Sequence, residues 1–419
     1  MTDTVVQESP PAPDAPAPAP THVAILGAGP VGLAAALAAA DAGWPFTVYE
    51  QAGHPGGNIA RWGHVRLFTP WSMNVSVPMA RHLRTAGLAV PDGADGYPTG
   101  TEFVARLLVP LAGLPELAGR IEYGTRVVAV GRAGLLKHEE IGTPARGARP
   151  FRLVLRRGDG TAATATAALV LDCTGNYATA NWTGDGGVPA PGEEDLGDRV
   201  VRHLPDLDAD RDAWAGREIL LVGAGKSAQT AARDLAALVA AAPGTRVHWV
   251  VRGTDPGWGE IPGDPLPQRQ ALVESSRRLA RGAVPGFEVV AGAAVDSFTV
   301  GPDGVTVGLC GPAGRRLRVD RVLSLTGYLP DPSLHRQLQV HECYATAAPI
   351  TLSAQLLGDA AGDCLTQPSY GVDVLRSPEP NYFQLGAKSY GRSSQFLLRV
   401  GYEQVAEVSG AYLPAPSRR

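Results

Sequence analysis

The sequence is poor in lysine, methionine and cysteine. Only three of its 37 basic residues are lysines, and its 419 residues include three methionines and four cysteines. Because alanine, glycine, proline, arginine and valine are abundant, we interpret this bias as a property of a GC-rich coding sequence and not of function. The formal net charge of −4 gives no electrostatic reason to expect a nucleic acid or an anionic membrane as partner.

The four cysteines are isolated from one another in the sequence. Cys173, Cys310, Cys343 and Cys364 form no C-x-x-C pair, and no histidine cluster accompanies them at metal-ligand spacing. This pattern excludes a structural zinc site of the usual spacing and a neighbouring redox dithiol, although distant cysteines can still meet in space. We expect four reduced thiols in a cytoplasmic protein, and no metal.

Long apolar runs and a secretory start are also missing. No run approaches the ~20 apolar residues of a membrane span, and no basic start precedes an apolar stretch. Residues 1–20 hold six prolines among small and polar residues, which predicts a disordered tail. The remaining length is too great for one compact core and predicts two domains.

A complete dinucleotide-binding pattern opens the folded part. An apolar strand at 23–26 is followed by Gly-Ala-Gly-Pro-Val-Gly at 27–32, a helix at 33–42 and a second strand at 46–50. Gly27 permits a tight turn, Gly29 permits close approach of a pyrophosphate, and Gly32 permits close packing of helix on strand. The helix N-terminus offers N–H groups to phosphates, and Glu50 can accept hydrogen bonds from ribose hydroxyls.

A pair of glycines after the second strand favours FAD as the dinucleotide of this first unit. Gly56 and Gly57 begin the run Gly-Gly-Asn-Ile-Ala-Arg-Trp, which ends at Trp62. Glycines there allow the backbone to lie against the flavin side of the cofactor.

A second unit with the same order of elements begins about 195 residues later. A strand at 218–222 precedes Gly-Ala-Gly-Lys-Ser-Ala at 223–228, a helix at 229–241 and a strand at 246–251. Ala228 at the third glycine position is an accepted variant. The residue after the last strand is Arg252 and not an acid, so it can pair with a 2′-phosphate. The second unit is therefore predicted to bind NADPH.

The intervening pattern predicts an α/β fold with two Rossmann-like domains, the NADPH domain being inserted in the FAD domain. We expect a helix at 101–114 and strands at 126–130, 151–156, 169–175 and 322–328, with a last helix at 394–408. The predicted divisions are an FAD-binding domain at 21–180 and 319–412 and an NADPH-binding domain at 195–318.

The order of motifs resembles the class B flavin-dependent monooxygenases, which include dimethylaniline-type, N-hydroxylating and Baeyer–Villiger enzymes. The resemblance covers most of residues 21–410. It runs through the FAD glycine motif, Gly-Gly-x-x-x-x-Trp at 56–62, Tyr-Pro-x-x-x-Glu-Phe at 97–103, Asp-Cys-Thr-Gly at 172–175, the second glycine motif and Thr-Gly-Tyr at 326–328. Thioredoxin-reductase-like flavoproteins fit less well, since they need a dithiol pair.

The resemblance implies that NADPH reduces FAD, that the reduced flavin reacts with oxygen to a flavin hydroperoxide, and that this oxygenates a small molecule. We expect Asn74 and His64 in the flavin-facing loop, and Lys388 near the last helix, as catalytic candidates. The predicted cofactor-binding residues are Gly27, Gly29, Pro30, Gly32, Glu50, Gln51, Gly57, Asn58, Trp62, Val127, Thr174, Gly175, Gly223, Gly225, Lys226, Ser227, Ala228, Arg252, Gly327, Gly386 and Lys388.

Three functions remain open from the sequence. The first is an NADPH- and oxygen-dependent monooxygenase acting on a nitrogen or sulfur atom or on a ketone. The second is a flavin oxidase or reductase that inserts no oxygen, and the third is a non-catalytic nucleotide-binding redox module. The substrate is not identified, and an oligomer is compatible with the sequence.

Overall fold

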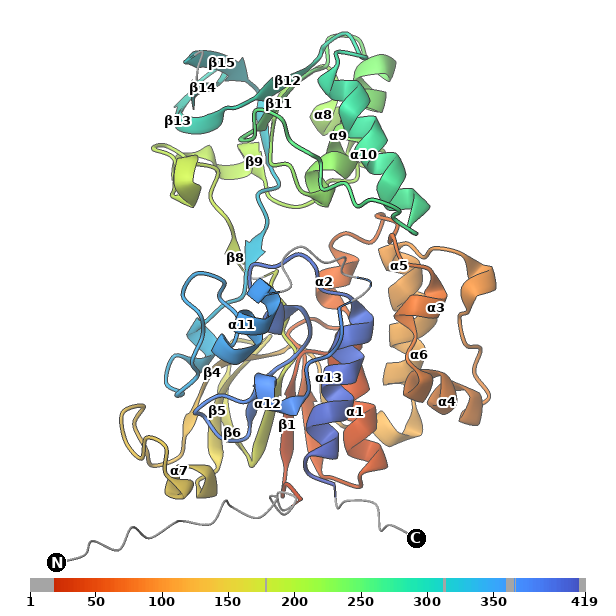
Figure 1. The fold of residues 1–419 in the computed structure, drawn as a ribbon, viewed down its shortest axis with the longest axis vertical. Coiled ribbons are helices and arrows are strands. Elements are labelled where there is room, and N and C mark those ends of the chain that lie inside the picture. The colour runs from red at the N-terminus through yellow and green to blue at the C-terminus, as the bar shows by residue number, and fades with distance from the viewer. Residues whose placement is uncertain (1–18, 178, 312–313, 359–364, 366, 414–419) are drawn as a thin grey trace, which may run out of the picture.

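The structure is a computed structural model that describes residues 19–177, 179–311, 314–358, 365 and 367–413. Figure 1 shows two lobes, one above the other, with a pair of short strands between them. The lower lobe holds the first and last parts of the chain, and the upper lobe holds the middle part. The predicted tail at 1–20 lies almost wholly outside the described residues.

A parallel sheet of five strands forms the centre of the lower lobe. Its order is β18-β7-β1-β2-β3. The strands are β1 (Val23–Leu26), β2 (Phe46–Tyr49), β3 (Ile121–Glu122), β7 (Leu169–Asp172) and β18 (Tyr382–Gln384). All four residues of β1 are buried, as expected for a central strand covered on both faces.

Helices α1 (Pro30–Asp41) and α13 (Leu398–Gly410) lie side by side in the lower lobe (Figure 1). Helix α1 begins three residues before the predicted start, because Pro30 occupies a position of the first turn where no intrahelical N–H is needed. Helix α13 begins four residues after its predicted start and ends at Gly410.

The rest of the lower lobe consists of short helices and a three-stranded antiparallel sheet. The sheet contains β4 (Thr125–Arg132), β5 (Phe151–Arg157) and β6 (Ala162–Ala167). The helices are α2 (Gly57–Ala60), α3 (Trp71–Asn74), α4 (Val77–Thr85), α5 (Gly100–Phe103), α6 (Val109–Ala112), α7 (Pro144–Ala148), α11 (Ile350–Gly358) and α12 (Val372–Leu375). A π-helical stretch at Val104–Leu108 joins α5 to α6, so the helix predicted at 101–114 forms with a changed hydrogen-bond pattern.

The upper lobe repeats the parallel arrangement. Its five-stranded sheet has the order β12-β11-β10-β16-β9. The strands are β9 (Val200–Val201), β10 (Glu218–Val222), β11 (Arg246–Val251), β12 (Phe287–Ala291) and β16 (Arg321–Ser324). The helices are α8 (Arg211–Trp214), α9 (Lys226–Ala241) and α10 (Pro267–Ala280), and a second sheet contains β13 (Ala294–Gly301), β14 (Gly304–Cys310) and β15 (Arg315–Val319). The predicted fold class is confirmed.

The chain passes between the lobes through β8 (Thr179–Ala180) and β17 (Tyr328–Leu329), which pair with each other antiparallel. The strand predicted at 322–328 is wrong in its extent, because β16 ends at Ser324 and Gly327 adopts a φ of +90°. Strand β16 pairs with β10 in the upper sheet, and the division into an FAD-binding and an NADPH-binding domain stays a prediction.

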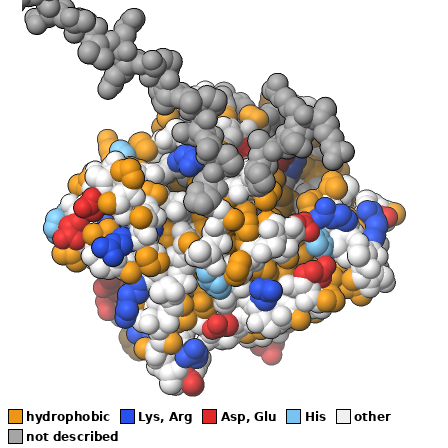
Figure 2. Space-filling view, turned by 90° about the horizontal axis from the view of Figure 1, so that it is seen from below, with side chains coloured by type: hydrophobic (Ala, Val, Ile, Leu, Met, Phe, Trp, Pro, Cys, Tyr) orange, Lys and Arg blue, Asp and Glu red, His pale blue; other side chains and the backbone are white. Residues whose placement is uncertain are grey.

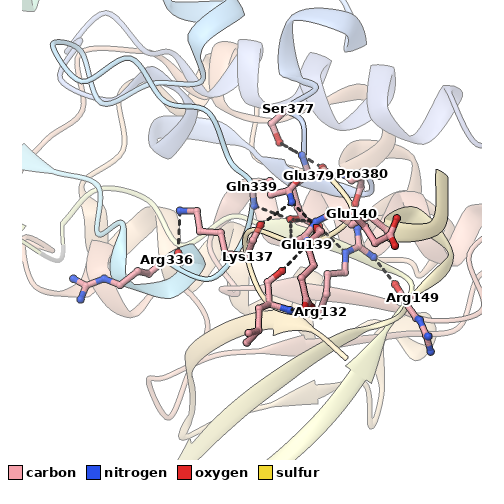
Figure 3. Close-up of polar contacts among 12 residues, drawn as sticks. Arg132, Lys137, Glu139, Glu140, Arg149, Arg336, Gln339, Ser377, Glu379 and Pro380 are labelled. Carbon is pink, nitrogen blue, oxygen red and sulfur yellow. Dashed lines mark hydrogen bonds and ion pairs between the residues drawn. The ribbon is translucent and has the colours of Figure 1, made fainter. Parts of the chain in front are cut away.

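A buried ion cluster links three segments of the lower lobe (Figure 3). The carboxylate of Glu379, just before β18, accepts from Nε of Arg132 at 2.6 Å and from Nη2 of Arg146 at 2.7 Å. All three side chains are fully buried. The backbone N–H of Gln339 donates to the same carboxylate at 2.7 Å, and the Arg132 guanidinium lies 3.7 Å from the Phe151 ring centroid. The cluster therefore joins β4, α7 and the approach to β18.

The face in Figure 2 carries acidic, basic and apolar side chains side by side, without a field of one sign. None of the helices in the described part of the chain is both long and apolar enough to cross a membrane.

Candidate dinucleotide-binding sites

The first glycine turn is crowded at Gly27 and Gly32 but has free space at Gly29. A Cβ added at Gly32 would lie 1.9 Å from the carbonyl oxygen of Gly27, so the helix can approach the strand only with glycine there. Gly27 has a φ of +96° and lies against the backbone of Cys173. A Cβ at Gly29, by contrast, would meet no atom within 4 Å. The space that Gly29 leaves free fits a phosphate group held at the start of α1.

Glu50 is held directly beside this turn. One carboxylate oxygen accepts the N–H of Ala28 at 2.7 Å, and the other accepts the N–H of Ala52 at 2.8 Å. The side chain is only 6% exposed, yet each oxygen keeps a lone pair for a further donor. This fits the ribose-binding role that the sequence predicts for Glu50.

The predicted glycine pair at 56–57 is joined to the same turn. The N–H of Gly56 donates to the carbonyl of Ala28 at 3.0 Å. A Cβ at Gly57 would lie 2.4 Å from the Cβ of Ala52. These glycines therefore bring the start of α2 against the residues that surround Glu50, while Gln51 is exposed and Asn58 is half-buried.

Lys388 forms a buried ion pair behind the turn. Its Nζ lies 2.6 Å from Oδ2 of Asp172 and 3.3 Å from Oγ1 of Thr174, and the side chain is 1% exposed. Burial alone would raise the pKa of Asp172, but the Lys388 ammonium and hydrogen bonds from Thr174 and Tyr382 outweigh it and lower this pKa. Lys388 therefore holds the carboxyl ends of β7 and β18 together.

The second turn repeats the geometry of the first. Gly223 has a φ of +125°, and a Cβ there would lie 2.3 Å from the carbonyl oxygen of Leu325. A Cβ at Gly225 would meet nothing within 4 Å, and Ala228 is fully buried at the third position. Arg252 follows β11, is exposed, and makes no hydrogen bond or ion pair with any described residue. Its guanidinium is thus available to a ligand.

Two further predicted residues of this unit differ in surroundings. Ser227 is exposed in the first turn of α9. The Nζ of Lys226 donates to the carbonyls of Trp258 at 2.9 Å and Gly259 at 3.3 Å, so it is occupied by protein oxygens. Burial, and the nearby charge of Arg269, lower the pKa of Lys226.

The catalytic candidates of the flavin-facing loop lie in different environments. Asn74 is 2% exposed, and its Nδ2 donates to the carbonyls of Thr69 at 2.9 Å and Pro70 at 3.0 Å. Its own carbonyl accepts the hydroxyl of Tyr402 at 2.8 Å, which ties α3 to α13. His64 is exposed. The catalytic roles of both residues stay predictions, and the Asn74 amide donors are already bonded within their own turn.

The remaining predicted cofactor residues have varied surroundings. Trp62 packs against Gly100, where a Cβ would lie 3.0 Å from the indole ring. Val127 is half-buried on β4, and Gly175 and Gly327 both have positive φ. Gly386 follows β18, and its N–H donates to Oε1 of Gln404 on α13 at 2.8 Å. The sequence reasoning missed Asp172 as a partner of Lys388 and missed Gln404.

The described cysteines do not form a dithiol. Cys173, Cys310 and Cys343 are all free, and Cys364 lies outside the described residues. Burial and the adjacent Asp172 raise the pKa of Cys173 far above its usual value. Hydrogen bonds from Thr346 and Ser353 lower the pKa of Cys343 to about 7. Within the described ranges, no group of three or more potential ligands is placed to hold a metal ion.

Comparison with known proteins agrees with this architecture. The family model of the NAD(P)-binding Rossmann-like domain matches residues 25–85, which include the first glycine turn and Glu50. No curated protein matches the sequence.

Several solved structures share the fold over almost their whole length. The bacillithiol disulfide reductase Bdr of Bacillus cereus has 19% identity and a TM-score of 0.66, with 94% of this chain and 98% of that chain covered. The FAD-bound cadaverine monooxygenase of Erwinia amylovora has 13% identity and a TM-score of 0.62, with 96% and 100% covered. The ornithine N-hydroxylase of Kutzneria, with reduced FAD and NADP⁺, has 18% identity and a TM-score of 0.59, with 94% and 98% covered.

The chain thus has the fold of flavoproteins that contain two dinucleotide-binding domains. This fold is shared by disulfide reductases and by N-hydroxylating monooxygenases, the group to which the sequence motifs are similar. At these identities the likeness establishes the fold, so the choice between the two activities depends on the chain's own residues.

Proposed function

We propose that the protein is an FAD-dependent oxidoreductase that oxidises NADPH and uses oxygen as a monooxygenase on a small molecule. The observation that carries this proposal is the pair of glycine turns. In each turn one glycine is too crowded for a larger residue and another faces free space. Glu50 lies beside the first turn, and Arg252 follows the strand after the second. A carboxylate suits a free ribose, whereas a guanidinium suits a 2′-phosphate.

FAD would be held by the first turn. Gly29 and the N-terminus of α1 receive its pyrophosphate, and Glu50 accepts from its ribose hydroxyls. The Asp172–Lys388 pair keeps Thr174 in place at the same edge of the sheet. When bound, FAD supplies the redox chemistry, and the protein supplies binding, orientation and exclusion of water.

The described cysteines lack the dithiol that disulfide reductases of the thioredoxin-reductase type use. A disulfide reductase of the thioredoxin-reductase type needs two thiols that can approach each other. Cys173 is held neutral in the lower lobe, Cys343 stands in a separate loop of that lobe, and Cys310 lies on β14 of the upper lobe. No pair among these three is bonded. The proposed substrate class is a compound with an oxidisable nitrogen or sulfur atom, or a ketone.

Oxygen reactivity tests the proposed chemistry. The NADPH-reduced holoprotein is mixed with oxygenated buffer, and the oxidised-flavin spectrum and the released hydrogen peroxide are followed together. A monooxygenase is expected to regain the oxidised spectrum slowly and to release peroxide only after a delay. Immediate reoxidation with stoichiometric peroxide would establish the alternative, an NADPH oxidase without oxygen insertion. If the purified protein contains no bound FAD, both enzymatic functions are refuted and the non-catalytic nucleotide-binding module is the remaining alternative.

The nicotinamide cofactor is tested at Arg252. Arg252→Ala is expected to raise the KM for NADPH about 10- to 100-fold, because it removes charge-assisted hydrogen bonds worth about 1.5–3 kcal/mol. The KM for NADH should change little, since NADH has no 2′-phosphate. Arg233→Ala, an exposed arginine on α9 that pairs with Asp234, is the matched control. An unchanged NADPH KM in Arg252→Ala would refute the phosphate assignment.

A further inference from the structure

Lys226 connects the second glycine turn to the segment that follows β11, residues 253–266, here named the cover segment. Its ammonium has three donors, and three oxygens surround it: the carbonyls of Trp258 at 2.9 Å and Gly259 at 3.3 Å, and Oε1 of Gln229 at 3.5 Å. An ammonium with three protein acceptors has no donor left for a phosphate.

Two neighbouring side chains make the same connection. Nε2 of Gln229 donates both to the carbonyl of Ala224 in the turn and to that of Trp258 in the cover segment, each at 3.0 Å. The indole N–H of Trp249 on β11 donates to the carbonyl of Gly223 at 2.7 Å, and its ring centroid lies 4.7 Å from that of Trp258. The glycine turn and the cover segment are therefore bonded into one unit.

The cover segment is also fixed at its far end. Asp264 and Arg269, at the start of α10, form an ion pair with an Nη2–Oδ1 distance of 2.7 Å and side chains only 5% and 8% exposed. Trp258 between the two anchors is 5% exposed and has a φ of +55°, a conformation that costs a tryptophan of the order of 1 kcal/mol or more. Such a conformation persists only where the surrounding contacts impose it.

We propose that Lys226 is a positioning residue that holds the cover segment against the glycine turn, so that the wall beside Arg252 is formed before the phosphorylated adenosine half of a dinucleotide binds. The proposal rests on the proposed function for the choice of ligand. It replaces the predicted role of Lys226 as a direct phosphate contact. A wall that is already ordered costs the ligand less entropy, and affinity rises accordingly.

The first test needs no ligand. In the nucleotide-free holoprotein, Lys226→Met is expected to raise amide hydrogen exchange across residues 253–266 about tenfold, because carbonyls lose hydrogen bonds to a charged donor. Chymotrypsin cleavage after Trp258 should rise in parallel. Lys226→Arg keeps the charge and donors and should restore much of the protection. Lys137→Met, which removes a lysine bonded to the carbonyl of Arg336 in the lower lobe, should leave both signals unchanged.

The second test uses 2′,5′-ADP as the probe and measures its Kd by calorimetry. Lys226→Met is expected to raise this Kd about tenfold, with Lys226→Arg between it and the wild type. A higher Kd with unchanged exchange would overturn the proposal and make Lys226 a direct phosphate ligand. Unchanged exchange and Kd would overturn it as well. If the wild type does not bind 2′,5′-ADP, the NADPH assignment fails, whereas the ligand-free exchange still decides whether Lys226 anchors the segment.

Discussion

Glu379→Ala is expected to lower the free energy of unfolding of the lower lobe by about 3–5 kcal/mol, the usual cost of removing one partner from a buried ion cluster. The cause is the pair of guanidinium groups that remain behind. Arg132 and Arg146 have no solvent exposure, so their charges would face each other without the carboxylate that separates them. Urea denaturation followed by circular dichroism measures the effect.

Two comparisons isolate this electrostatic cause. Glu260→Ala breaks an exposed Glu–Arg pair with Arg277 and should leave the urea midpoint almost unchanged, because solvent screens this pair. Replacing Glu379, Arg132 and Arg146 together by leucine or methionine should cost less than Glu379→Ala alone, because no uncompensated charge is then buried. If the triple variant is instead the less stable, packing and not charge determines the contribution of the cluster.

Gly32→Ala is expected to abolish FAD binding and to destabilise the apoprotein by about 3 kcal/mol or more, the upper range of overpacking costs. The new methyl carbon would lie 1.9 Å from the Gly27 carbonyl oxygen, so α1 must move away from β1. The measurements are the ratio of flavin to protein absorbance after purification and the urea midpoint of the apoprotein.

Gly29→Ala separates the open part of the turn from the closed part. Its methyl carbon would meet no protein atom within 4 Å, so the apoprotein should keep its stability. The FAD Kd should nevertheless rise about 10- to 100-fold, because the methyl group fills the space of the pyrophosphate. Gly410→Ala, at the far end of α13 and also without a close neighbour, is the control for both variants. Equal FAD affinity in Gly29→Ala and the wild type would contradict a phosphate site there.

The elements predicted well are those whose signals are local in the chain. Strands β1, β10 and β11 form with the predicted bounds. Each consists mainly of apolar residues, several of them β-branched, which favour strands. A glycine turn follows β1 and β10, and the charged Arg252 follows β11, so the ends of the strands are also marked in the sequence. The break between β16 and β17 was missed. It depends on Gly327 at positive φ and on the pairing of β17 with β8, which is remote in sequence.

The same distinction holds for the sites. Gly27, Gly29, Gly32 and Glu50 lie within one βαβ unit, so their spacing alone is enough to predict them as a site. The partner of Lys388 is Asp172, which only the parallel pairing of β7 with β18 brings near. The cover segment contains many glycines and prolines, and this composition predicts an ordinary loop. Its order comes from Lys226, Gln229 and Trp249, which lie outside it.

The insertion of the upper lobe has a consequence for synthesis on the ribosome. Strand β18 and helix α13, which complete the lower sheet and cover α1, leave the ribosome after the whole upper lobe. The upper sheet is complete at Ser324 and can fold while the lower sheet still lacks an edge strand and Glu379. The nascent lower lobe therefore exposes apolar surface until β18 and α13 have emerged, and stable FAD binding is expected only after that point.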